Sequence, residues 1–532
     1  MHGDLVVLAV LLGAGAFLLL ADRTQIPYPI LLVIGGTALA FVPGVSEFVL
    51  DPDVVLLAFL PPLLYGAAFF TSLQDLRANY KPIGLLAVGL VAFTTVTVAV
   101  VAHHVVGLPW SAAFVLGAVV SPTDPVAATE IAVRSHAPRR LVTIVEGESL
   151  INDSTGLIAY KFAIAAVLTG TFDAFDALGS FVWSAVAGIA IGVAVGWAVG
   201  ELRRRLDDAP TETAISLLTP YVAYLPAEAL GVSAVLAAVS AGLYLGWRSP
   251  ELVTPSTRIQ LVGFWELLTF GLNAALFVLI GLQLSTVVDG LHGYSTGDLI
   301  GYSLAVAGTV LATRLAFLFP FNVVSRLLVR RLPRIRNAAH EPDPPDYWLT
   351  LLLGWSGMRG AVSLAVALAI PLRTDAGAPF PGRDLIIFLA YAVILITVVG
   401  QGLTLGKLID VAGVYDDDET VFEQEARARI EASRAALARI DELESEEWVR
   451  EASADRMRRG YEFRIRRFES RLDEDDDGDI EQGSQAYQRL RRDVLAAERA
   501  AIVRARNRGD ITDDIMRRIE RDIDLEDARL EI

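Results

Sequence analysis

The sequence of 532 residues contains no cysteine, so disulfide bonds and thiolate metal sites are excluded. It has no HExxH motif and no glycine-rich phosphate loop ending in GKS or GKT, which leaves zinc proteolysis and ATP-driven pumping without support. It also has no TVGYG segment of the kind that forms a potassium-channel filter. We expect no cofactor and seek the function in the chain's own side chains.

Long apolar runs fill the first 410 residues instead. Hydrophobic residues make up 53% of the chain, which is high for a soluble protein. Many runs are long enough to cross a hydrocarbon core of about 30 Å, and the first is preceded by no basic segment of the signal-peptide type. We predict an all-α polytopic membrane protein with about thirteen transmembrane helices, at 5–21, 27–43, 52–71, 82–106, 110–133, 140–168, 178–200, 212–229, 231–247, 262–284, 298–324, 347–371 and 384–409.

The distribution of basic residues predicts how these spans are oriented. Loops after even-numbered spans carry only Arg373 and Arg383. Because basic loops remain cytoplasmic, we expect a multi-pass protein of the cell membrane with its N-terminus outside and its C-terminal tail in the cytoplasm. The loops after odd-numbered spans carry Arg23, Arg77, Lys81, Arg134, Arg139, Arg140, Arg203, Arg204, Arg205, Arg248, Arg258, Arg326, Arg330, Arg331, Arg334 and Arg336.

The fifth span contains an aspartate between two prolines, in GAVVSPTDPVAA. A carboxylate at membrane depth is costly, so its default interpretation is functional. Pro122 and Pro125 remove backbone donors and free nearby carbonyls. Unwound carbonyls beside Asp124, with an oxygen from Thr123, are typical of a site for a hard monovalent cation. The alternative is a proline-kinked helix with a buried, protonated aspartate.

The sixth span carries a second acid near the middle of the membrane, in IVEGESLINDSTGLIAY. Asp153 and Ser149 are four residues apart and share one helix face. Asn152 can donate or accept a hydrogen bond without adding charge. Glu148 lies five residues nearer the cytoplasm than Asp153. A purely structural role for Asp153 is the competing interpretation.

Two arginines in later spans offer compensating charge. Arg314 lies in TVLATRLAFLF and Arg359 in LGWSGMRGAVS. Arginine keeps its proton when buried, so each needs a partner. We predict an ion pair between Glu148 and Arg314, which would leave Asp153 free to bind or release a proton. Alternatively, each arginine snorkels or donates to backbone carbonyls.

The twelfth span is interrupted by Gly354, Gly357 and Gly360, seven spans after the interrupted fifth. Interrupted helices in corresponding positions indicate an inverted repeat, of spans 1–6 and 8–13, around a midplane transport site. The sequence does not decide the roles of other polar residues in the spans. Lys161 is expected to snorkel outward, and Asn273 and Glu266 in the tenth span are candidates for added polarity near the site.

The tail from residue 411 is polar and rich in alanine, glutamate and arginine, and predicts a soluble helical region over 411–532. Most of the formal charge of −17 lies there, which argues against a nucleic-acid partner. Asp473, Asp475, Asp477 and Gly478 match the start of a calcium loop, although Ser484 replaces its final glutamate. The simpler interpretation is an acidic turn between helices.

Three segments together resemble the sodium–proton antiporters of the NhaP/NHE type, especially the bacterial form. They are SPTDPVA in the fifth span, GESLIND in the sixth and WSGMRGAVSLA in the twelfth. FLPPLLYGAAF in the third span and LNAALFVLIGLQL in the tenth also fit. The similarity covers residues 1 to about 410, and the end of the tail is also similar to that of the bacterial form.

The resemblance implies a homodimer in which a core domain of spans 4–6 and 11–13 moves like an elevator against a dimerisation domain of spans 1–3 and 8–10. It implies an Asn–Asp pair at Asn152 and Asp153 and a structural ion pair of Glu148 and Arg314 with Arg359 nearby. Cation ligands are implied at Thr123, Asp124 and Ser149, with Na⁺ held between these residues and Asp153. Some relatives carry a further acid in the third span where this chain has Gly66.

We expect a secondary transporter, and no enzyme, that exchanges Na⁺, or alternatively Li⁺ or K⁺, for H⁺ across the membrane. A buried carboxylate must be neutralised by a proton or by a cation, so Asp153 would bind one or the other. One titrating acid predicts electroneutral exchange. The alternatives are a channel-like potassium transport system and an intramembrane aspartyl hydrolase that uses Asp124 and Asp153 as a dyad.

Overall fold

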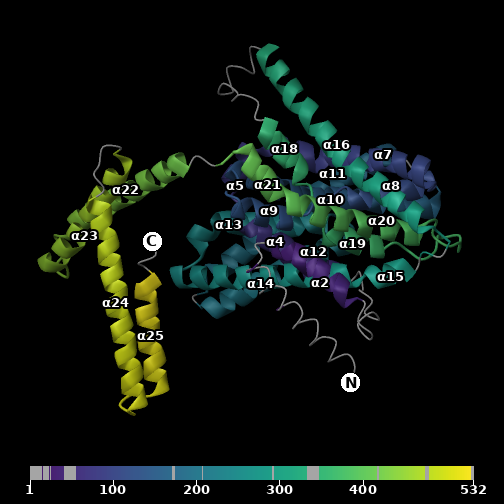
Figure 1. The fold of residues 1–532 in the computed structure, drawn as a ribbon. Coiled ribbons are helices and arrows are strands. Elements are labelled where there is room, and N and C mark those ends of the chain that lie inside the picture. The colour runs from purple at the N-terminus through teal and green to yellow at the C-terminus, as the bar shows by residue number, and fades with distance from the viewer. Residues whose placement is uncertain are drawn as a thin grey trace. The chain divides into compact units, whose positions relative to one another are not determined.

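A computed structural model describes residues 15, 23, 26–40, 55–170, 174–206, 208–289, 291, 293–331, 347–415, 418–473 and 479–528. Contacts divide the chain into two compact units, Met1–Asp416 and Asp417–Ile532. Within the described ranges the secondary structure is helical, apart from an isolated bridge between Arg373 and Pro379 (Figure 1). The predicted all-α class is confirmed.

Helices or broken helices of the first unit lie at each predicted span from the second to the thirteenth. The first predicted span, 5–21, lies outside the described residues except for residue 15. In chain order, with η marking π-helical turns, the elements are α2 (Tyr28–Leu39), η1 (Val55–Phe59), α4 (Leu60–Phe70), α5 (Leu73–Ala78), α6 (Tyr80–Gly84), η2 (Leu85–Leu90), α7 (Val91–Val101), η3 (Ala102–Val106), α8 (Trp110–Val120), α9 (Val126–Arg134), α10 (Arg139–Thr169), α11 (Ala174–Arg203), α12 (Ala209–Ala229), α13 (Ala234–Leu252), α14 (Pro255–Leu282), α15 (Leu284–Asp289), α16 (Thr296–Arg331), α18 (Tyr347–Trp355), α19 (Ala361–Leu368), α20 (Arg383–Leu395), η4 (Ile396–Gln401) and α21 (Gly402–Ala412).

Several of these helices are suited to a membrane by length and hydropathy. Among the described residues, five are long and apolar enough to cross one: Tyr80–Val106, Ala177–Arg203, Pro255–Leu282, Thr296–Pro320 and Arg383–Ala412. Shorter apolar helices lie at Tyr28–Leu39, Leu56–Phe70 and Trp110–Val120. The number of thirteen crossings and the inverted repeat stay predictions.

Close helix contacts organise the first unit. α2 packs on α14, α4 and α11 pack on α13, and α10 packs on α8. On α11, a methyl group added at Gly192 would collide with the backbone carbonyl of Ala237 on α13. Small residues of this kind let two helices approach closely in a bilayer, where lipid provides no hydrophobic drive for association.

The second unit consists of the tail helices α22 (Asp418–Leu443), α23 (Glu451–Leu472), α24 (Asp479–Asn507) and α25 (Asp513–Ala528). Phe468 of α23 is buried against Ala426 and Ile430 of α22. The Thr512 hydroxyl accepts a hydrogen bond from the Ile515 N–H at 3.4 Å, at the start of α25. Asp475 and Asp477 of the possible calcium loop lie outside the described residues.

Candidate functional site

The fifth predicted span is a broken helix, with α8 ending at Val120 and α9 starting at Val126. The Asp124 carboxylate accepts a hydrogen bond from the Val126 N–H at 2.9 Å and so caps α9. The Asp124 N–H donates to the Met358 carbonyl at 2.8 Å. This bond joins the break in the fifth span to the break in the twelfth.

The twelfth predicted span is broken between α18 and α19, at residues 356–360. A methyl group added at Gly360 would collide with the Asp124 carboxylate, so the close crossing of the two breaks needs a glycine there. The Asp124 carboxylate also lies beside Ala361, at the first residue of α19. It therefore sits at the N-terminal ends of two half-helices, where partial positive charge favours an anion.

A bidentate ion pair lies next to this crossing. Arg314 Nη1 and Nη2 are 2.5 Å and 2.7 Å from Glu148 Oε1 and Oε2, and both side chains are only 1% exposed. Arg314 Nε also donates to the Leu353 carbonyl at 3.0 Å, near the end of α18. The pair thus connects α10, α16 and the broken twelfth span.

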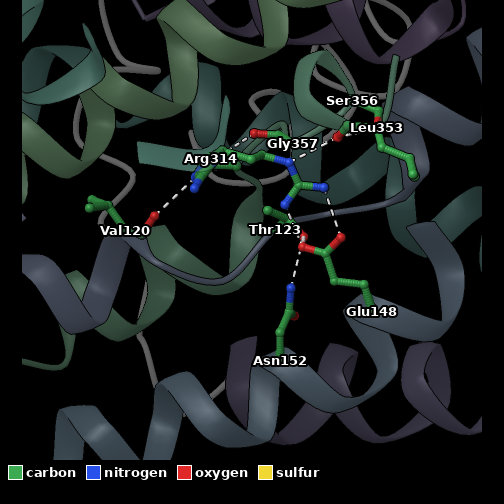
Figure 2. Close-up of polar contacts among 9 residues, drawn as sticks. Val120, Thr123, Glu148, Asn152, Arg314, Leu353, Ser356 and Gly357 are labelled. Atoms are coloured by element: carbon green, nitrogen blue, oxygen red, sulfur yellow. Dashed lines mark hydrogen bonds and ion pairs between the residues drawn. The ribbon is translucent and has the colours of Figure 1, made fainter. Parts of the chain in front are cut away.

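Hydrogen bonds extend from this pair toward the midpoint of α10, as Figure 2 shows. The Thr123 hydroxyl donates to Glu148 Oε1 at 3.1 Å. The Asn152 side-chain amide donates to the Thr123 oxygen at 2.7 Å. Asn152 Oδ1 is buried and accepts no hydrogen bond within the part of the chain that the structure describes.

Asp153 is different from the other buried acids. It is 6% exposed, and among the described residues its carboxylate has no hydrogen bond and no ion-pair partner. It lines a cavity of about 430 Å³ together with Thr123, Asp124 and Ser149. Of the described residues, those around this cavity include four acids and no lysine, arginine or histidine; the acids are Asp124, Glu130, Glu146 and Asp153.

The family model described as "Sodium/hydrogen exchanger, transmembrane" matches residues 6–410. The chain belongs to the sodium/hydrogen exchanger family. It is 35% identical to an uncharacterized Na⁺/H⁺ exchanger of Mycobacterium tuberculosis over 532 residues, covering 99% of this chain and 96% of that one. It is 36% identical to the sodium, potassium, lithium and rubidium/H⁺ antiporter of Bacillus subtilis, covering 70% of this chain and 56% of that one.

The fold agrees with this assignment. The structure of the sodium proton antiporter MjNhaP1 from Methanocaldococcus jannaschii superposes with a TM-score of 0.58 at 19% identity, covering 77% of this chain and 99% of that one. Together with the apolar helices, the family identifies a multi-pass membrane protein, and the predicted resemblance is confirmed.

In this exchanger the predicted site residues lie around one helix crossing. Thr123, Asp124, Ser149 and Asp153 line the cavity, and Asn152 reaches it through Thr123. Arg359 binds no carboxylate among the described residues. Instead, its Nε donates to the Val120 carbonyl at 2.9 Å and its Nη1 to the Gly357 carbonyl. It therefore caps the C-terminal end of α8, which is the carbonyl-bonding alternative considered for the buried arginines.

Some polar positions of the exchanger were missed or misjudged from the sequence. Glu146 lines the cavity, and its spacing of seven residues from Asp153 places both on one face of α10. Asn273 also lines the cavity, whereas Glu266 is exposed elsewhere on α14. Lys161 pairs with Glu228 at 3.2 Å, which the expectation of simple snorkelling overlooked.

Proposed function

We propose that this exchanger is a secondary antiporter that moves Na⁺, Li⁺ or K⁺ against H⁺ across the cell membrane, with Asp153 binding either the proton or the cation. The observation that carries this proposal is the contrast among three buried acids. Glu148 is neutralised by Arg314, and Asp124 caps the ends of two half-helices. Asp153 faces a cavity with no such partner among the described residues, so a proton or a cation must supply its neutralisation.

The oxygen atoms around Asp153 are suited to a hard monovalent cation. Asp124 and Ser149 line the same cavity. The Thr123 oxygen accepts one hydrogen bond from Asn152, and a hydroxyl oxygen has two lone pairs. One lone pair of Thr123 therefore remains for a cation. The cations named for the Bacillus subtilis relative support the monovalent class, although the preferred ion of this chain is part of the proposal.

The decisive experiment uses proteoliposomes with an internal pH dye and pulses of Na⁺, Li⁺ or K⁺. Asp153→Asn should abolish cation-driven proton movement while the melting temperature stays close to that of the wild type, because the amide preserves the side chain's shape. Asp410→Asn is the matched control, since Asp410 is an exposed aspartate of α21 that does not line the cavity. Exchange retained by Asp153→Asn would exclude the central role of Asp153.

The same assay tests the stoichiometry. One unpartnered carboxylate predicts one proton per monovalent cation and therefore electroneutral exchange. With the membrane potential clamped at different values, the exchange rate should stay constant. A rate that depends on the potential would indicate a second proton, and Asp124 would be the candidate group that carries it.

The remaining elements of the proposal come from the resemblance. We infer a homodimer in which the cavity faces one side of the membrane at a time, with a core containing α10 moving against a scaffold containing α4, α13 and α14. The basic-loop rule supports a cytoplasmic tail and an external N-terminus. Cross-linking of single-cysteine variants in a chain that has no native cysteine would test both the dimer and the orientation.

A further inference from the structure

A second polar site lies away from the cation cavity, where the C-terminal ends of α11 and α13 pack together. A cleft of about 70 Å³ there is lined by Trp197, Glu201 and Arg204 from α11 and its end, and by Tyr244 and Arg248 from α13. Gly200 also borders the cleft, and a methyl group added to it would lie 3.3 Å from Leu252 Cδ1. The absence of a side chain at Gly200 thus keeps the space between the two helices open.

The arginines of this cleft are only partly neutralised. Arg248 Nη2 lies 2.9 Å from Glu251, but Arg248 Nε is buried and has no hydrogen-bond partner among the described residues. A buried donor without a partner is costly and indicates a ligand or water. Glu201 forms ion pairs with two arginines, Arg204 at 3.5 Å and Arg205 at 3.1 Å. Among the described residues, the cleft is lined by two arginines, Arg204 and Arg248, and one carboxylate, Glu201, so its lining carries an excess of positive charge.

An apolar helix face leads directly to this cleft. Along the outer side of α11, Trp183, Val186, Ile189, Val193 and Trp197 are each between 41% and 67% exposed. Only 11% of the apolar stretch of α11 is buried, the smallest share among the five candidate spans of the described residues. This face is long enough to follow an acyl chain, and it ends with a tryptophan at the rim of the cleft, as is common at a membrane interface.

We propose that this cleft binds the phosphate of an anionic phospholipid whose acyl chains lie along the outer face of α11. The guanidinium group forms bidentate, charge-assisted hydrogen bonds with phosphate, so Arg204 and Arg248 provide the recognition. The apolar face selects a lipid over a free anion. This site is independent of the cation chemistry at Asp153, because it lies on other helices and shares no residue with the cavity.

The test is native mass spectrometry of the full-length protein, titrated with dioleoyl phosphatidylglycerol or dioleoyl phosphatidylcholine. Wild-type protein should bind the anionic lipid about 25-fold more tightly, because each of the two arginines contributes an attraction of about 1 kcal/mol near an anionic surface, which corresponds to about fivefold each. The double variant Arg204→Gln/Arg248→Gln should lose this preference, and Arg248→Lys should keep part of it. Arg140→Gln is the control, since Arg140 is an exposed arginine of α10 outside the cleft.

Several results would overturn the proposal. Equal affinity of the wild type for both lipids, or an unchanged preference in the double variant, would exclude phosphate recognition by these arginines. Release of phosphatidylglycerol by millimolar inorganic phosphate would identify a free-anion site instead. A change in oligomeric state without a change in lipid binding would make this face a protein interface. The melting temperature of each variant in phosphatidylcholine verifies that the variant is folded.

Discussion

Removing one partner of the Glu148–Arg314 pair should destabilise the exchanger far more than removing both. Arg314→Gln eliminates two charge-assisted hydrogen bonds to Glu148 and one bond to the Leu353 carbonyl. The larger loss comes from Glu148, which is 1% exposed and would remain charged without a cation. Breaking a buried pair from one side costs about 3–5 kcal/mol, because an uncompensated charge stays in the interior.

The reverse substitution has a similar cost for the opposite reason. Glu148→Gln leaves the Arg314 guanidinium buried without a carboxylate partner among the described residues, with the Leu353 carbonyl and the introduced amide as neutral acceptors. In the double variant Glu148→Gln/Arg314→Gln no charge remains to be neutralised. We expect the double variant to lose about 1–2 kcal/mol of stability, less than either single variant. Replacing a buried ion pair by uncharged residues often changes the stability little.

The measurement is a double-mutant cycle on unfolding in detergent, with exchange in proteoliposomes as a second readout. A coupling energy of about 4 kcal/mol or more is expected, because each single variant should lose at least about 3 kcal/mol and the double variant at most about 2 kcal/mol. This value lies above the range of about 0.5–3 kcal/mol that is usual for residues in direct contact. Thr123→Val serves as a reference for the loss of neutral hydrogen bonds without a charge, because the Thr123 hydroxyl donates to Glu148 and accepts from Asn152. Additive losses in the cycle, or single variants as stable as the wild type, would refute the buried-charge argument.

Two further predictions concern the helix crossing and the tail. Gly360→Ala should lower the stability by about 1–3 kcal/mol, because it introduces a steric clash into a packed interior. It should also lower the cation affinity, because the new methyl group displaces the Asp124 carboxylate. Gly271→Ala, where a methyl group meets nothing within 4 Å, is its control, and equal effects would refute the crossing argument. In the tail, hydrogen bonds from two α23 arginines lower the pKa of Glu481 to about 2. This pKa lies below the value of about 4.3 for a glutamate in the unfolded chain, so the ion pairs of Glu481 stabilise the folded tail at neutral pH. They should protect the start of α24 from hydrogen exchange there. The protection should be lost as the pH falls from about 4.5 toward about 2. Glu481→Gln should remove the protection at neutral pH, and a pH-independent difference from the wild type would contradict this assignment.

Local sequence features predicted the helix breaks because their causes are local. Pro122 and Pro125 remove backbone donors whatever surrounds them, and the break between α8 and α9 falls at these residues. Counting residues along two spans was also enough to pair Glu148 with Arg314. The depth of each residue in the membrane follows from its position in the span and the helical rise of about 1.5 Å per residue. Features of this kind depend only on the spacing of residues along the chain, and this spacing can be read directly from the sequence.

Contacts between distant segments could not be predicted in the same way. Arg359 caps the Val120 carbonyl because the two broken spans cross, and no pattern in either span encodes that crossing. Arg203 was counted as a loop charge, but it is 1% exposed and donates to the Glu212 carbonyl at 3.2 Å. Position along the chain places an arginine near a membrane surface, but it does not reveal whether neighbouring helices cover the side chain.

The contacts of α10 indicate along which side this helix could slide past its neighbours at the lowest cost in free energy. On one side α10 is fixed by the Glu148–Arg314 pair, whose rupture costs several kcal/mol. On the side facing α12 and α13, the Ser154 and Ser233 hydroxyls lie 2.6 Å apart, and Lys161 meets Glu228 in a largely exposed pair. A neutral hydrogen bond is worth about 1 kcal/mol and an exposed pair about 0–1 kcal/mol. If the proposed exchange moves α10 past α13, these two contacts can therefore break and reform at little cost, whereas α10, α16 and the two broken spans must move as one body.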